Sequence, residues 1–267
     1  MATSSKSKHV RSISLPRSHF TQKVEEAVNS LKTLKISTAS TAETMHDGLL
    51  GLEELYKCMN DLLTLPQTLQ ALSQYQQGKL VEDLLDKSVR LLDLCGAIME
   101  LVLQYKENVR DLQSSLRKRK TDSTTETSMA KFTTFNKKIK KEAKRLVSIL
   151  KKMDQKTEGI VSQDADEDTV DMIKTLTEAN AMRISIFQMF LSFLSVPLLK
   201  PKSSKFSLVS SFVNKGRIAC VGQEEKMNLE TRLESFEAHL DNFENGLEGL
   251  FRRMNRSRSS LLNMKSC

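Results

Sequence analysis

The sequence has little of what strand-rich folds and tight turns need. Its 267 residues include no Trp, three Tyr, four Pro and nine Gly, whereas Leu, Lys, Glu, Ser and Thr are abundant. No stretch of useful length alternates apolar and polar residues as a half-buried strand does. These scarcities exclude a sheet-based fold and predict an all-α protein, whose length is enough for one long helical domain or two small ones.

The cysteines are few and scattered. None belongs to a CxxC motif, so a disulfide framework is not indicated, and we expect reduced thiols of a cytosolic or nuclear protein. The first twenty residues lack the apolar core of a secretory signal. We therefore expect a cytoplasmic location, with peripheral attachment to a membrane as an alternative and a nuclear location ranked below both. The four cysteines are Cys58, Cys95, Cys220 and Cys267.

Groupings of residues that carry catalysis or hold metal ions are also missing from the sequence. The four histidines lie far apart, without an HxxxH or Cys–His spacing. A run of acids from Asp164 matches the start of an EF-hand calcium loop, but Thr169 stands where that loop needs Gly and Thr175 where it needs Glu. Neither a Gly-rich phosphate loop nor a nucleophile turn is present. We therefore predict no catalytic residue, no metal site, no cofactor and no enzymatic activity.

What the sequence has in abundance is apolar residues at helical spacing. Between residues 81 and 116 they recur in alternating steps of three and four, with Ser88 as the polar member of the series. This spacing predicts an amphipathic helix over residues 79–118. The series consists of Val81, Leu84, Ser88, Leu91, Cys95, Ile98, Val102, Tyr105, Val109, Leu112 and Leu116.

Four further stripes of the same kind predict more helices. The most regular covers residues 229–254, and we expect it to pack on the helix over residues 79–118, with a homodimer through the same stripe as the alternative. The stripe over residues 45–63 follows a Ser40-x-x-Glu43 capping box. The predicted fold is therefore an elongated helical bundle with coiled-coil-like heptad seams. The remaining stripes cover residues 20–34 and 132–153.

Composition predicts the domain boundaries. Residues 1–19 are basic and rich in Ser, and we predict a disordered tail there, followed by one helical bundle domain over residues 20–267. Polar stretches predict linkers inside this domain near residues 121–128, 154–168 and 200–205.

Positive charge is concentrated in three patches, near residues 1–20, 117–145 and 252–267, although the net charge is only +8. The middle patch contains a predicted basic amphipathic helix over residues 131–152. Such a helix suits an anionic membrane surface or a calmodulin-like partner, and also a solvated face of a bundle. Nucleic-acid binding ranks low, because the aromatic residues of this helix fall on its apolar face. The candidate basic surface consists of Lys137, Lys138, Lys140, Lys141, Lys144 and Arg145.

The most apolar stretch, residues 184–199, is sixteen residues long and contains Gln188, three Ser and Pro197. It is shorter than the roughly 20 residues that span a bilayer core. We expect a helix that is buried in the bundle. The alternative is a segment embedded in a membrane, with Arg183 and Lys200 as interfacial anchors.

Several stretches spread over nearly the whole chain carry a family resemblance. They are LPQTLQALS at residues 65–73, VEDLLDKSVRLLDLCG at 81–96, LQSSLRKRK at 112–120 and LFRRMNRSRSSLLN at 250–263, with RSISLPRSH near the start. In these motifs the chain is similar to the BYPASS-related proteins of plants. The resemblance implies a predominantly helical, plant-specific protein linked to root and shoot development, and it implies no particular biochemical activity.

The sharpest short motif lies in the tail and consists of Arg11, Ser12, Ser14 and Pro16. It fits the RSxSxP pattern in which a phosphoserine docks into the arginine cluster of a 14-3-3 protein. Arg11 would be read by a basophilic kinase, and Pro16 would turn the peptide out of the binding groove. Phosphorylation of Ser14 would add about −1.5 to −2 charge and three acceptor oxygens. A plain disordered tail is the alternative.

Together these patterns predict a non-enzymatic helical interaction or scaffold protein with a phosphoregulated tail. The alternative is a peripheral membrane protein held by the basic helix over residues 131–152 and the apolar segment over residues 184–199. Its partners would be proteins in the first case and an anionic lipid surface in the second.

A phosphopeptide covering residues 6–20 tests the tail motif. With phosphate on Ser14 it should bind a 14-3-3 protein at micromolar affinity, worth about 8 kcal/mol. The unphosphorylated peptide lacks the dianion and should not bind measurably. Ser14→Asp should restore binding poorly, because one carboxylate supplies less charge and fewer acceptors than a phosphate. Fluorescence anisotropy measures all three peptides, and a phosphopeptide that binds no 14-3-3 isoform would leave only a plain tail.

Overall fold

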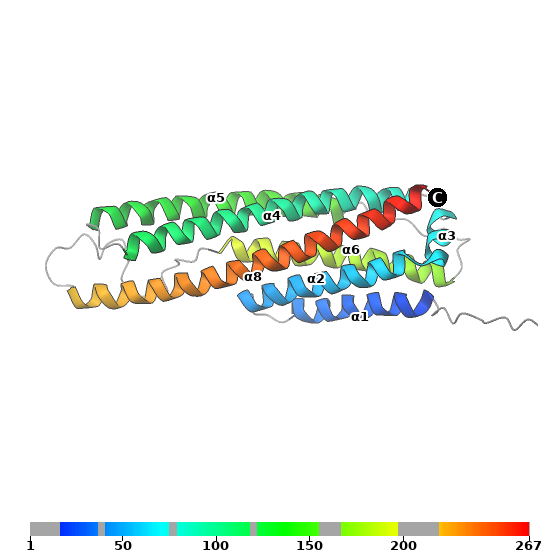
Figure 1. The fold of residues 1–267 in the computed structure, drawn as a ribbon, viewed down its shortest axis with the longest axis horizontal. Helices are drawn as coiled ribbons and strands as arrows, with labels where there is room; N and C mark the ends of the chain where they lie inside the picture. Colours follow the sequence, from blue (N-terminus) through cyan, green and yellow to red (C-terminus); the bar gives the residue numbers. More distant parts are fainter. Residues whose placement is uncertain are drawn as a thin grey trace, which may run out of the picture.

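The computed structural model describes residues 17–36, 41–74, 79–117, 122–154, 167–196 and 219–266, and within them the chain forms seven helices and no strand. The predicted all-α fold is thereby confirmed for this part of the chain. The long helices lie side by side in an elongated bundle (Figure 1). The seven are α1 (Arg17–Ile36), α2 (Ala42–Leu63), α3 (Pro66–Gln74), α4 (Lys79–Arg117), α5 (Asp122–Asp154), α6 (Glu167–Leu194) and α8 (Ala219–Ser266).

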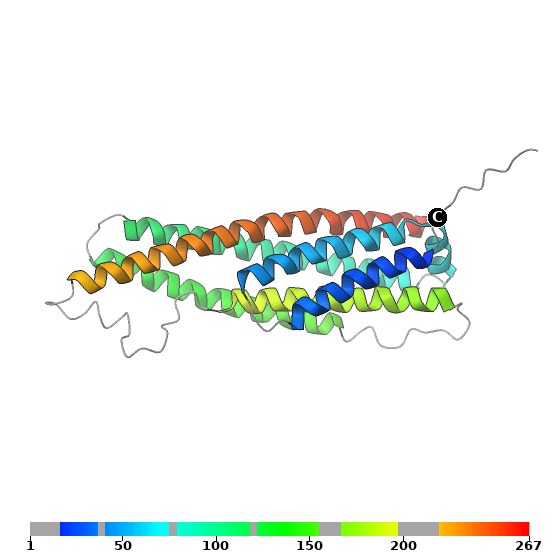
Figure 2. The same ribbon diagram turned by 90° about the horizontal axis from the view of Figure 1, so that it is seen from below.

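The six long helices of the described residues alternate in direction, and the short α3 turns the chain at one end of the bundle (Figure 1, Figure 2). Their packing forms a closed ring in the order α1, α2, α8, α4, α5, α6 and back to α1. α2 also packs on α6 across this ring. Because α8 lies between α2 and α4, a helix from the C-terminal part of the chain joins two helices of its N-terminal half into one bundle.

The predicted apolar stripes form the core of the bundle. Every apolar member of the series over residues 81–116 is buried, and its polar member Ser88 is half-buried. In α8 the stripe is buried from Leu233 to Met254, against both α4 and α2. The predicted packing of this stripe on the helix over residues 79–118 is confirmed, whereas coiled-coil heptad geometry stays a prediction.

α2 begins one residue later than the predicted capping box requires. Its N-cap is Thr41, whose side-chain oxygen accepts a hydrogen bond of 3.2 Å from the backbone N–H of Thr44. Glu43 lies in the first turn, where a hydrogen bond from its own backbone N–H and a second from Thr41 lower its pKa. The capping-box prediction was therefore wrong by one position, because the neighbouring hydroxyl residue satisfies the free N–H groups of the helix end.

Two helix boundaries lie inside segments predicted as tail or linker. α5 begins at Asp122, so residues 122–128 are helical, and α1 begins at Arg17, so residues 17–19 of the predicted tail are helical as well. Thr and Ser are weak helix formers, which is why composition indicated a linker. Tertiary packing overrides such propensities, and α5 packs on both α4 and α6.

The other two predicted linkers are only partly covered. Three residues of the predicted linker at 154–168 belong to helices, because α5 ends at Asp154 and α6 begins at Glu167. The residues between these two helices lie outside the described ones. The linker at 200–205 lies outside the described residues.

α6 contains most of the apolar stretch at residues 184–199. Its apolar side chains are buried or half-buried up to Leu194, where the helix ends, and Ser192 is exposed, which confirms a bundle helix for residues 184–194. Arg183 lies inside the helix and is itself buried, so its predicted alternative role as an interfacial anchor is wrong. Among the residues that the structure describes, none of the helices meets the length and apolarity that crossing a bilayer requires.

Val102 tests the burial of the α4 stripe. Its side chain is fully buried, whereas that of the next residue, Leu103, is 42% exposed. Val102→Asp should lower the free energy of unfolding by about 4 kcal/mol, because it buries an unpaired carboxylate. The control Leu103→Asp should change it by about 0.5 kcal/mol. Urea unfolding followed by circular dichroism measures both, and equal losses in the two variants would contradict the orientation of α4.

Candidate interaction surface

α5 has two opposite faces with different composition. One face packs on α4 and α6, and the helix lies along the edge of the bundle, on the side away from α1 (Figure 1). The other face is therefore open to solvent. The buried face consists of Phe132, Ile139, Ala143, Leu146, Leu150 and Met153.

The open face of α5 is basic along its length. All six residues of the predicted basic surface are exposed, and three further exposed lysines lengthen it at both ends. At 1.5 Å per residue, residues 131–152 form a strip about 30 Å long. We call the nine residues the α5 basic face: Lys131, Lys137, Lys138, Lys140, Lys141, Lys144, Arg145, Lys151 and Lys152.

One acid, Glu142, interrupts the sequence of this strip. Its Oε1 accepts hydrogen bonds from Nη2 of Arg145 at 2.6 Å and from Nε at 2.8 Å. These bonds lower the pKa of Glu142 and raise that of Arg145. The charge of Arg145 is thus balanced within the helix, while the eight lysines form no ion pair with any described residue.

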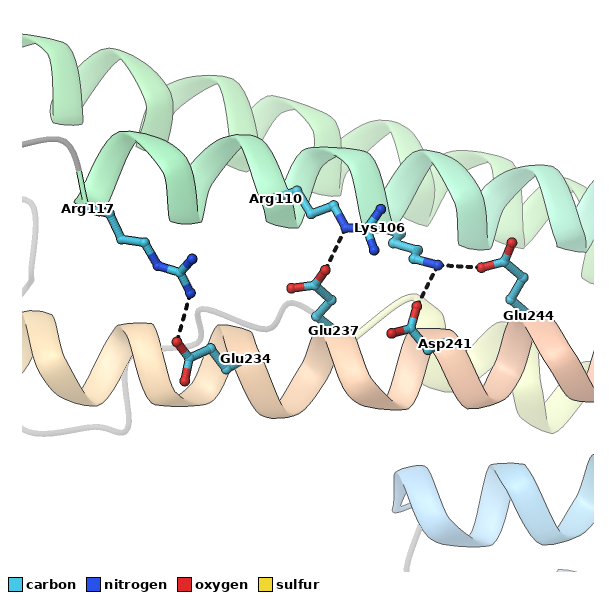
Figure 3. A network of polar contacts seen from close by, with 7 residues as sticks. All are labelled: Lys106, Arg110, Arg117, Glu234, Glu237, Asp241 and Glu244. Atoms are coloured by element: carbon cyan, nitrogen blue, oxygen red, sulfur yellow. Dashed lines mark hydrogen bonds and ion pairs between the residues drawn. The ribbon is translucent and has the colours of Figure 1, made fainter.

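A ladder of ion pairs aligns α8 with α4 in antiparallel register (Figure 3). Nζ of Lys106 contacts Oδ1 of Asp241 at 2.5 Å and Oε2 of Glu244 at 2.6 Å. Both hydrogen bonds raise the pKa of Lys106, that to Asp241 more strongly. Because the lysine side chain is only 16% exposed, water screens this pair less than an open surface pair.

Two arginines continue the ladder toward the end of α4. Nε of Arg110 donates to Oε1 of Glu237 at 2.5 Å, and Nη2 of Arg117 donates to Oε1 of Glu234 at 2.9 Å. This ladder was not predicted from the sequence. The sequence does indicate an acidic side on α8, because its four acids recur in steps of three, four and three and therefore lie on one side of the helix.

The chain matches the family model described as Protein BPS1 over residues 48–264. It belongs to this family. The match runs from α2 nearly to the end of α8 and therefore includes the α5 basic face and the ion-pair ladder. It confirms the resemblance to BYPASS-related plant proteins. No curated protein and no solved structure gives a significant match to the chain.

Two other sequence predictions bear on function. The motif of Arg11, Ser12, Ser14 and Pro16 lies outside the described residues, so phosphorylation and 14-3-3 binding stay predictions. In the part of the chain that the structure describes, no group of three His, Cys, Asp or Glu side chains is placed to hold a metal ion.

The ladder predicts unequal couplings at its two ends. Side chains of Lys106 and Glu244 are 16% and 26% exposed, whereas those of Arg117 and Glu234 are 61% and 56% exposed. Double-mutant cycles with alanine should give a coupling of about 1 kcal/mol for the first pair and about 0.3 kcal/mol for the second. Urea unfolding of the single and double variants measures both couplings.

The pH dependence of the Lys106 pair checks its physical origin. A lysine whose pKa is raised by folding contributes stability that is fully present below its unfolded pKa of about 10.4. This contribution should be lost as the pH rises through the higher folded pKa.

In the double-mutant cycles, a coupling at Lys106 that is no larger than the coupling at Arg117 would contradict the partial burial of the Lys106 pair.

Proposed function

We propose that this BPS1-family protein is a non-enzymatic interaction or scaffold protein of plant root and shoot development, and that it binds an acidic partner protein through the α5 basic face. The exposed strip of eight lysines without ion-pair partners among the described residues is the observation that carries the proposal. A face that only kept the bundle in solution would be served by mixed charges. A strip of one sign attracts surfaces of the opposite sign and speeds their association.

An acidic protein surface suits this face better than insertion into a membrane does. A membrane-bound amphipathic helix places its apolar side in the lipid, but Phe132, Ile139 and Leu146 are buried inside the bundle. The apolar side chains of residues 184–194 are buried or half-buried in the bundle and offer no anchor in this fold. Peripheral attachment to an anionic leaflet through charge alone is the alternative function.

The hollow beside α5 adds an apolar contact to the basic face. It is wide open, and its lining includes Lys131, Phe135 and Lys138. Phe135 is only partly buried and packs on the core from the side of this hollow. A partner helix with acids around one apolar residue would match its charge and cover Phe135.

The tail would add a second, regulated contact to the proposed function. Phosphorylated Ser14 in its RSxSxP setting supports recruitment of a 14-3-3 protein, which would take place in the cytoplasm. Tail and α5 basic face would then bind different partners, as a scaffold requires.

Charge reversal at four lysines tests the proposed surface. The face variant carries Lys137→Glu, Lys138→Glu, Lys141→Glu and Lys144→Glu. The control variant makes the same change in net charge on other helices, with Lys23→Glu, Lys35→Glu, Arg252→Glu and Arg256→Glu, all at exposed positions. Affinity purification from plant cells with quantitative mass spectrometry should show acidic partner proteins reduced at least tenfold for the face variant and retained for the control.

Flotation with anionic and neutral lipid vesicles separates the two functions. The wild type should remain unbound to both kinds of vesicle. Binding to anionic vesicles that only the face variant loses would favour the peripheral membrane alternative. Partner proteins retained equally by both variants would mean that the α5 basic face is a solvated surface.

A further inference from the structure

A small, largely enclosed cavity lies where α2, α4, α6 and α8 meet. Its volume is about 20 Å³, and most of its wall consists of Leu and Met side chains. Each of the four helices also contributes one polar residue to the wall. They are Tyr56 from α2, Ser88 from α4, Arg183 from α6 and Ser257 from α8.

Arg183 is a buried cation whose charge is not balanced by a neighbouring acid. The residue is 5% exposed, and its guanidinium lies over the ring of Tyr56, with Cζ 5.0 Å from the ring centroid. Nη2 donates a hydrogen bond of 2.9 Å to Oδ1 of Asn180, but Nε has no partner. No Asp or Glu of the described residues forms an ion pair with it. A buried charge without a counter-charge is strongly destabilising, so this site calls for an anion.

Two hydroxyl groups in the same wall also lack partners. Oη of Tyr56 and Oγ of Ser257 are buried without a hydrogen bond, whereas Oγ of Ser88 already donates to the backbone oxygen of Leu85 at 2.6 Å. Burial raises the pKa of Tyr56 and outweighs the opposing effect of the neighbouring Arg183 guanidinium, so the hydroxyl keeps the proton that it can donate. Buried polar groups in native proteins are nearly always satisfied. Three free donors around one cavity therefore indicate a ligand that accepts hydrogen bonds.

We propose that this cavity binds one monovalent inorganic anion of the size of chloride, with Nε–H of Arg183 and the hydroxyls of Tyr56 and Ser257 as donors. A single negative charge balances the guanidinium, whereas a divalent anion would leave one buried charge unpaired. A water molecule also fits a cavity of this size. Water brings no charge, however, and it accepts at most two of the three hydrogen bonds. The anion would link α2, α6 and α8 inside the bundle, toward the end at which α3 lies.

Thermal unfolding of the full chain tests the anion site. Chloride is replaced stepwise by gluconate at constant ionic strength, because gluconate is too large for the cavity. The Tm of the wild type should rise with chloride and reach a plateau, as saturable binding to the folded state requires. Arg183→Met should abolish this dependence whatever its own Tm is. Tyr56→Phe and Ser257→Ala, which each remove one donor and little volume, should shift the half-saturating chloride concentration at least tenfold upward.

Ser259→Ala is the matched control, because Ser259 is an exposed serine of the same helix and should leave the chloride dependence unchanged. Chlorine NMR gives a direct measurement, since exchange with a protein-bound site broadens the chloride line. Broadening that is present in the wild type and absent in Arg183→Met would support the site. A Tm that is identical in chloride and gluconate, or a dependence that Arg183→Met and Ser257→Ala retain, would overturn the proposal and leave water in the cavity.

Discussion

The burial of α8 between α2 and α4 is the packing contact on which the rest of the bundle depends. Leu233, Leu240, Phe243, Leu247 and Leu250 are fully buried there, and each such side chain contributes about 1.5–3 kcal/mol. Without α8, the stripes of α2 and α4 would face water, since these two helices meet mainly through it. The last helix of the chain is therefore the one that completes its core.

Polar contacts decide how α8 lies in this position. Lys106 and the two arginines of α4 align it in antiparallel register, and on its other side Arg253 donates to Glu53 of α2 at 3.1 Å. Exposed pairs of this kind add little free energy, but a shifted register would leave their charges without partners. Close approach acts in the same direction, because a Cβ on Gly246 would lie 3.3 Å from the side chain of Leu49.

The two proposed sites differ in where the charged side chains lie, outside the bundle on α5 and inside it on α6. The apolar stripe of α5 is buried, and its exposed face carries mostly positive charge, which would suit an acidic protein partner. In α6 the reverse holds, because Arg183 places a charge inside the bundle and stacks it on Tyr56. An outer charge strip can select a partner by attraction, whereas an inner charge constrains how four helices meet around it.

The sequence alone determined the all-α fold, the apolar stripes and the basic face of α5, because helical periodicity is a local property that each segment carries by itself. The sequence also identified Ser88 as the polar member of its stripe. It did not predict the cavity that Ser88 lines. Only the tertiary structure decided that α8 lies between α2 and α4, that its acids meet Lys106 and Arg110, and that Arg183 is buried instead of anchoring a helix end. These outcomes depend on which helices pair and in what register. The spacing of the acids on α8 marks a charged side of that helix, but it does not say which other helix that side meets.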